Sequence, residues 1–113
     1  MELTYQTQKM KKASMNESAA RKALGDDLAR LFLGQLADMR EAMFLGELPD
    51  QPEVSLKDGG VILNYPLGES VSLEVEPVGF GKIDTTAWHG VHRVKLVRVH
   101  APRSLTISLS PST

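Results

Sequence analysis

Two stretches of this sequence are rich in lysine and arginine, the side chains best suited here to binding an anionic partner. The first lies within residues 1–22 and holds five basic residues against two acidic ones: Lys9, Lys11, Lys12, Arg21 and Lys22. Clustered cations bind polyanions, so one interpretation of this stretch is an arm that contacts phosphate or an acidic protein surface. Two alternatives stay open: a solvated arm, or an arm ordered by the packing of Leu3 and Tyr5.

The second basic stretch spans residues 91–103. Its basic residues are Arg93, Lys95, Arg98, His100 and Arg103. One interpretation is a surface that follows a phosphate backbone or binds an acidic partner. The alternative is cross-strand ion pairing with the carboxylates of a neighbouring strand, supplied by Glu69, Glu74 and Glu76.

The segment from Pro77 to Gly90 is the longest one without periodicity, and it is a candidate binding loop. Long loops on a rigid sheet often carry binding residues, and tryptophan is a frequent interface anchor. We therefore predict a partner-binding surface that combines this loop with the basic amino end of a helix: Phe80, Lys82, Trp88, His89, Lys12, Arg21 and Lys22. The alternative for Trp88 is a core residue that closes one end of the sheet.

Signatures of catalysis and of metal binding are weak. Gly79-Phe80-Gly81-Lys82 lacks the spacing, the Ser or Thr, and the following helix that a phosphate-binding loop requires. His89 and His92 stand three positions apart, which places them on opposite faces of a strand. Asp84 joins them only if the loop folds back, and the sequence has no cysteine to complete a tetrahedral site. We predict no metal, no cofactor and no enzymatic activity.

The totals are those of one ordinary globular domain. The chain has 113 residues, a net charge of −1, 42% hydrophobic and 24% charged residues, and no cysteine. Such a balance creates no overall field toward nucleic acid or membranes. We find no signal peptide and no apolar run of membrane-spanning length, so we expect a cytoplasmic protein that does not contact membranes.

Residues 14–46 have the pattern of one long amphipathic helix, preceded by a polar basic arm over residues 1–13. Ser14 and Glu17 have the spacing of a capping box, and Gly46 is placed for the position after the last turn. Apolar residues recur every three or four positions, and the segment contains no proline and no β-branched residue: Ala20, Leu24, Leu28, Leu31, Phe32, Leu36, Met39 and Met43.

The length of this helix has a consequence. From Met15 to Leu45 it would extend about 46 Å, whereas a domain of this size is about 35 Å across. Either the polar end at residues 15–22 projects toward a partner, or the chain bends back at Gly25.

Residues 53–110 change to the alternation typical of β-strands. The expected strands lie over 54–56, 61–67, 71–75, 91–100 and 105–109. Pro66 has no N–H and is therefore expected at a strand end or on an edge. The basic side chains change face between Lys95 and Arg98, which predicts a bulge near Leu96 and Val97.

These elements predict an α+β domain, residues 14–113, with one amino-terminal helix and a curved, mainly antiparallel five-stranded sheet or small barrel. A single helix covers only part of such a sheet. We expect either closure of the sheet into a barrel or a second copy that supplies the missing cover.

The functional hypothesis is a small non-enzymatic protein–protein interaction module, such as an adaptor, an inhibitor or an assembly subunit. It binds its partner through the 77–90 loop and the projecting amino end of the helix, and its partners include a second copy of itself in a homodimer. The alternative hypothesis is a nucleic-acid-binding protein that uses Lys9, Lys11, Lys12, Arg93, Lys95, Arg98 and Arg103.

Overall fold

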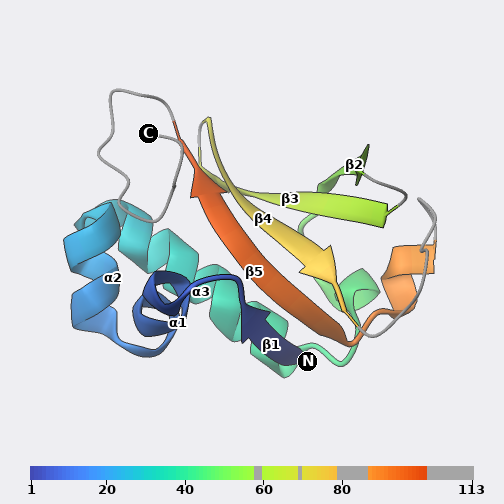
Figure 1. The fold of residues 1–113 in the computed structure, drawn as a ribbon, viewed down its shortest axis with the longest axis horizontal. Coiled ribbons are helices and arrows are strands. Elements are labelled where there is room, and N and C mark those ends of the chain that lie inside the picture. Colours follow the sequence, from blue (N-terminus) through green and yellow to red (C-terminus); the bar gives the residue numbers. More distant parts are fainter. Residues whose placement is uncertain (58–59, 69, 79–86, 102–113) are drawn as a thin grey trace.

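The computed structural model describes residues 1–57, 60–68, 70–78 and 87–101. Helices gather on one side of a curved sheet (Figure 1). The elements, with η for a short 3₁₀ helix, are β1 (Glu2–Tyr5), α1 (Gln8–Met15), α2 (Glu17–Leu24), α3 (Asp26–Glu41), η1 (Leu45–Glu47), β2 (Glu53–Lys57), β3 (Gly60–Gly68), β4 (Val71–Pro77), η2 (Ala87–Gly90) and β5 (Arg93–His100). The predicted α+β class is confirmed.

The sheet has five strands in the order β1-β5-β4-β3-β2. Strands β2 to β5 form the antiparallel meander that the alternation predicts. Strand β1 adds to the outer edge of β5 in parallel, with Leu3 opposite Val94 and Tyr5 opposite Leu96. The sheet is therefore mixed and open, so the prediction of a small barrel is wrong. The expected strand over 105–109 lies outside the described residues.

The prediction of a single helix over 14–46 is wrong, because α2 and α3 form there as separate helices, and α1 precedes them, mostly within the predicted arm. Asn16 separates α1 from α2: its backbone is extended, and its side chain accepts a hydrogen bond from the Ala19 N–H at 3.0 Å. Ser14 is not a helix cap. It is buried in the last turn of α1, where its hydroxyl donates to the Met10 carbonyl oxygen at 2.7 Å.

Gly25 separates α2 from α3. Its φ of 84° and ψ of 163° lie in a region that only glycine adopts readily. The alternative of a chain that bends back at Gly25 is thus confirmed, and no helix end projects from the described part of the chain. Helix α3 ends at Glu41, and Gly46 lies in η1 against His89 instead of following the last helical turn.

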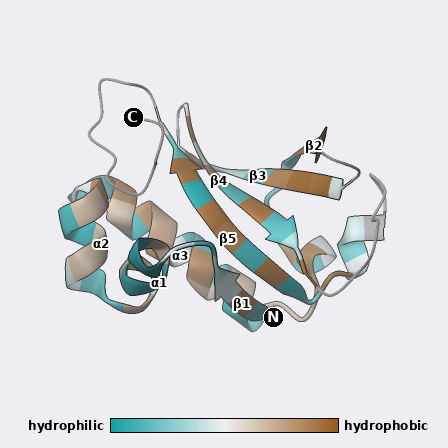
Figure 2. Ribbon diagram, in the orientation of Figure 1, coloured by the Kyte–Doolittle hydropathy of each residue, from teal (hydrophilic) through white to brown (hydrophobic). Residues whose placement is uncertain are grey.

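Helix α3 and the inner face of the sheet make the core. Phe32, Leu36 and Met39 are fully buried on α3, where their spacing of three and four places them on one face. They are joined by buried residues of the strands: Leu63, Tyr65, Leu73, Val75, Leu96 and Val99. Hydrophobic and hydrophilic bands alternate along β4 and β5 in Figure 2. Burying a side chain as large as Phe32 stabilises the fold by about 3 kcal/mol.

A β-bulge interrupts β5 at the predicted place. Val75 pairs with Leu96 and the adjacent Glu74 pairs with Arg98, so Val97 is an extra residue. The bulge decides which face of the sheet the following side chains occupy. The extra residue returns Arg98 and His100 to the outer face that Lys95 already occupies, so the basic side chains of β5 share one face.

Pro66 lies near the end of β3. The last pair between β2 and β3 is Glu53 with Asn64, so β3 has an open edge at Pro66, as its missing N–H predicts.

The molecule measures 35 × 27 × 25 Å. Helices α1 and α2 lie at one end of the long axis, and η2 lies at the other (Figure 1). In the described part of the chain, no helix is long and apolar enough to cross a membrane.

Candidate functional site

A groove of about 380 Å³ lies between α1 and α2. Lys9 and Lys12 of α1 and Lys22 of α2 line it with exposed side chains. Three alanines are buried or half-buried and form its floor: Ala13, Ala19 and Ala23. The small alanine side chains leave a hollow between the two helices, and the helical spacing directs the lysines to its rim.

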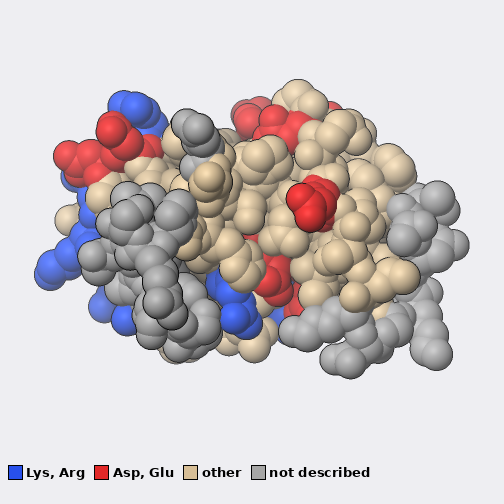
Figure 3. All heavy atoms as spheres, turned by 90° about the horizontal axis from the view of Figure 1, so that it is seen from above, with Lys and Arg blue, Asp and Glu red and all other residues tan. Residues whose placement is uncertain are grey.

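A second depression, of about 600 Å³, adjoins this groove and shares Lys9, Lys12 and Asn16 with it. It adds Lys11 and Met15, whose side chain is 68% exposed. We call the two depressions together the lysine groove. It has four lysines and no aspartate or glutamate among its described lining residues. Figure 3 shows basic side chains at this end of the molecule, beside a group of acidic ones.

Hydrogen bonds at the ends of α1 and α2 fix the two helices that form the lysine groove. The Met10 N–H donates to the Thr7 side chain at 3.1 Å at the start of α1, and Asn16 caps α2. The Arg40 guanidinium of α3 donates to the Ser14 carbonyl oxygen at 3.2 Å, which holds the end of α1 against α3. Sequence reasoning singled out the lysines and missed the groove. The cap-forming residues Thr7 and Asn16 were the available signal for two short helices.

Arg21, another predicted contact, does not line the groove. It forms an ion pair with Glu17 at 3.7 Å, one helical turn away, and both side chains are largely exposed. Such a pair contributes only a few tenths of a kcal/mol to stability.

The predicted loop residues lie at the opposite end of the molecule or outside the described residues. Phe80, Lys82 and Asp84 are outside them. Trp88 is only 5% exposed, so the alternative of a core residue is the one that the structure shows. Its ring stacks on the exposed His89 ring with centroids 4.0 Å apart. A Cβ added at Gly46 would lie 3.1 Å from His89, so η1 and η2 are in close contact.

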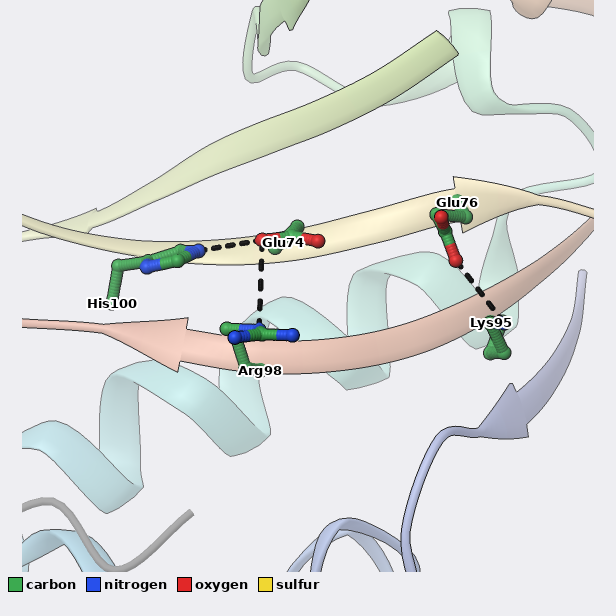
Figure 4. Close-up of polar contacts among 5 residues, drawn as sticks. All are labelled: Glu74, Glu76, Lys95, Arg98 and His100. Carbon is green, nitrogen blue, oxygen red and sulfur yellow. Dashed lines mark hydrogen bonds and ion pairs between the residues drawn. The ribbon is translucent and has the colours of Figure 1, made fainter. Parts of the chain in front are cut away.

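The basic side chains of β5 face carboxylates on the neighbouring strand (Figure 4). Lys95 Nζ lies 3.1 Å from Glu76, and His100 Nε2 lies 2.6 Å from Glu74. Arg98 Nε approaches the same Glu74 oxygen at 3.8 Å. The predicted alternative of cross-strand ion pairs is confirmed for these residues, whereas Glu69 and Arg103 lie outside the described residues.

Arg93 pairs in the same way with β1, because its Nε lies 3.3 Å from Glu2. The outer face of the sheet therefore carries matched charges. Next to it is a hollow of about 590 Å³ whose lining includes Glu53, Asn64, Ser72 and His100. His100 already uses one ring nitrogen on Glu74, and the described lining contains no lysine or arginine.

The histidines do not form a metal centre among the residues that the structure describes, because no three His, Asp or Glu side chains there are grouped to hold an ion. Phe44 contacts the His92 ring edge to face, with centroids 6.4 Å apart.

No known family, curated protein or solved structure matches this chain. Its function is therefore argued from the residues and their geometry.

Proposed function

We propose that this chain is a small non-enzymatic protein-interaction module that binds an acidic segment of a partner protein through the lysine groove. One observation carries the proposal: Lys11, Lys12 and Lys22 surround an alanine floor, and the lining residues that the structure describes include no carboxylate. Elsewhere in the chain, the described ion pairs put a carboxylate beside Arg21, Arg30, Arg93, Lys95 and Arg98. Such a module can serve as an adaptor, an inhibitor or an assembly subunit.

The lining also indicates the shape of the partner. A groove with an apolar floor suits an amphipathic helix, whose apolar face packs on the alanines while its acidic side chains reach the lysines. Met15 at the rim is flexible and exposed, and methionine adapts well to an apolar partner. An acidic helix with leucine on one face fits both features.

Nucleic acid is the second candidate, because the same lysines are suited to phosphates. Proteins that bind single strands add aromatic side chains on which bases stack. Neither depression has an aromatic residue among its described lining residues, and the cations of β5 are matched by carboxylates. These observations favour the protein partner. The 77–90 loop is not part of this surface, since Trp88 is buried, His89 stacks on it at the far end of the molecule (Figure 1), and Phe80 and Lys82 lie outside the described residues.

The test uses fluorescence anisotropy to measure the binding of two labelled probes. One is a helical peptide with leucines on one face and glutamates on the other, and the second is a uridine oligonucleotide. Lys12→Glu in the groove is compared with Arg30→Glu, an equal charge change on the exposed surface of α3. We expect Lys12→Glu to lower peptide affinity about tenfold or more, a loss of about 1.4 kcal/mol. Arg30→Glu should leave the affinity within about twofold.

The outcomes separate the candidates. Equal losses in the two variants would show that only overall charge matters and would contradict the groove. Tighter binding of the oligonucleotide than of the peptide, lost in Lys12→Glu and falling steeply with salt, would favour nucleic acid instead.

A further inference from the structure

Strand β2 is an edge strand, because β3 is its single partner among the strands that the structure describes. Its residues alternate between faces. Val54 and Leu56 pair with Leu63 and Val61, which belong to the core, so they point to the helix-covered face. Val54 is half-buried, but Leu56 is 66% exposed. An exposed leucine on an unpaired edge is a feature that stable monomers usually avoid.

The backbone of β2 leaves a defined set of hydrogen-bonding groups free. Only two residues separate Lys57 from Gly60, and a two-residue connection closes on a hydrogen-bonded pair. Because such pairs alternate along the strands, Glu53, Ser55 and Lys57 bond to β3. Val54 and Leu56 then direct their N–H and C=O groups to the open edge.

The residues of β2 are complementary to themselves in the antiparallel direction. A two-fold axis at Ser55 places the Glu53 position of one copy opposite the Lys57 position of the other, so each end of the pairing joins one acidic and one basic residue type. The same axis places Val54 opposite Leu56, which are the residues with free backbone groups. Each of these two pairs exchanges two hydrogen bonds, and the apolar side chains meet on one face.

We propose that the β2 edge is the site at which a second copy of this chain binds, in antiparallel register about Ser55. Two five-stranded sheets then join into one continuous sheet, and an axis perpendicular to the sheet keeps the helices of both copies on the same side. The charge pattern favours a second copy over an unrelated strand, since only an antiparallel copy matches both charged ends. The interface is a short strand, so the dimer is weak.

The inference does not rest on the proposed function. The β2 edge and helices α1 and α2 lie at different ends of the molecule (Figure 1), so each surface can be altered without the other.

Cross-linking tests the register directly. The chain has no cysteine, so Ser55→Cys introduces a single one. A pair that is not hydrogen-bonded brings two Cα atoms about 4.5 Å apart, within the range of a disulfide. Under mild copper-phenanthroline oxidation we expect most of the variant to form a disulfide dimer. The control Ser18→Cys, at an exposed site on α2, should stay mostly monomeric under the same conditions.

Sedimentation velocity over a concentration series tests the charge pattern. Glu53→Lys places like charges opposite each other at both ends, and we expect the dissociation constant of the dimer to rise about tenfold. The double variant Glu53→Lys/Lys57→Glu reverses both charges and should restore the wild-type constant. Binding of the acidic peptide should be unchanged in the double variant, whereas Lys12→Glu should leave the dimer intact.

Three results would overturn the proposal. One is a wild-type chain that stays monomeric at the highest soluble concentration. Another is Ser55→Cys cross-linking no faster than Ser18→Cys. The third is a dimer that Glu53→Lys weakens and the double variant does not restore, which would place the second copy elsewhere.

Discussion

The lysines of the groove and the cations of β5 differ in what lies across from them. On β5, Lys95 faces Glu76 while Arg98 and His100 face Glu74, all at positions set by the pairing with β4. In the lysine groove, no carboxylate is among the described lining residues. The two stretches are similar in composition, and only the surroundings separate them.

The difference follows from backbone geometry. Neighbouring strands bring side chains within about 5 Å of each other, so a basic residue opposite an acidic one is paired by the sheet itself. Two short helices joined at Asn16 carry their lysines on exposed helical positions, outside the ladder of the sheet. The cations of β5 stabilise the fold through pairing that the strand register sets, whereas strand pairing does not position the groove lysines.

The largest effect is expected from inserting one alanine between Arg98 and Val99, which shifts the faces of β5 by one residue after the bulge. If Arg98 stays opposite Glu74, Val99 turns outward and His100 turns to the core face. We expect a loss of about 5 kcal/mol or more, enough to abolish cooperative thermal unfolding followed by circular dichroism. Deleting Val97 is the control: it removes the bulge but leaves Leu96 facing the core and Arg98 facing outward, so it should cost only about 1–3 kcal/mol. Similar melting of both variants would show that the faces of β5 do not decide stability.

Glu74→Ala tests the matched surface at its most buried carboxylate, which is 8% exposed. The substitution leaves Arg98 and His100 without their partner, and we expect a loss of about 2 kcal/mol in denaturant unfolding. Glu76→Ala is the control, because its pair with Lys95 is about one-third exposed and should contribute about 0.5 kcal/mol. Equal losses would mean that burial does not distinguish the pairs.

Gly25→Ala addresses the bend that folds α2 back onto α3 and so shapes the groove. No atom lies within 4 Å of an added Cβ, so the cost comes from the backbone conformation alone. We expect a loss of about 1–3 kcal/mol. Gly34→Ala, inside α3 and equally free of contacts, should instead stabilise by about 0.5–1 kcal/mol. Stabilisation by both substitutions would contradict the bend.

Tyr65→Phe tests a buried polar group that has no hydrogen-bond partner in the described part of the chain, whereas Glu74 is a buried polar group with two partners. Within the described residues the Tyr65 hydroxyl has no hydrogen-bond partner, so its removal should stabilise the fold by up to about 1 kcal/mol. Burial, with the Asp50 carboxylate second, raises the pKa of Tyr65 above its ordinary value near 10.

The raised pKa also predicts a pH dependence. Above pH 10 the folded chain binds more protons at Tyr65 than the unfolded chain does, so stability is complete below that pH and falls above it. Denaturant unfolding between about pH 9 and about pH 11, one unit on either side of the ordinary tyrosine pKa, should show a smaller decline in Tyr65→Phe than in wild type. Parallel declines would assign the effect to other groups.

The smallest effect on stability is expected in the groove. Lys12→Ala/Lys22→Ala removes two exposed cations, and the free energy of unfolding should change by no more than about 0.5 kcal/mol. Affinity for the acidic peptide should fall in the same variant. A large loss of stability would place these lysines with the structural cations of β5.

Much of the sheet follows from local pattern. The alternation of Val71, Leu73 and Val75 with polar residues predicts β4, and the change of face after Lys95 predicts the bulge. Strands that follow one another in the sequence usually pair through a short connection, so the antiparallel order of β2 to β5 could be predicted from the sequence.

The division into three helices was harder to predict from the sequence, because the apolar spacing continues across Asn16 and Gly25. Each short helix carries its own stripe, and the stripes together resemble a single long one. Strand β1 was the hardest element to predict, because Leu3 and Tyr5 pair in parallel with β5, far away in the sequence. The Thr4 Oγ1 hydroxyl, for example, donates to the Val94 carbonyl oxygen, 90 positions along the chain. Parallel pairing over such a separation leaves no local signal in the sequence.

The sequence by itself determined the class of fold, the strands of the meander and the presence of two basic stretches, since these depend on composition and on spacing along the chain. Only the tertiary structure decided which basic residues meet a carboxylate, that Trp88 is buried, and that three helices replace one. Those outcomes depend on distances between residues far apart in the chain, and such distances are set when the elements pack together.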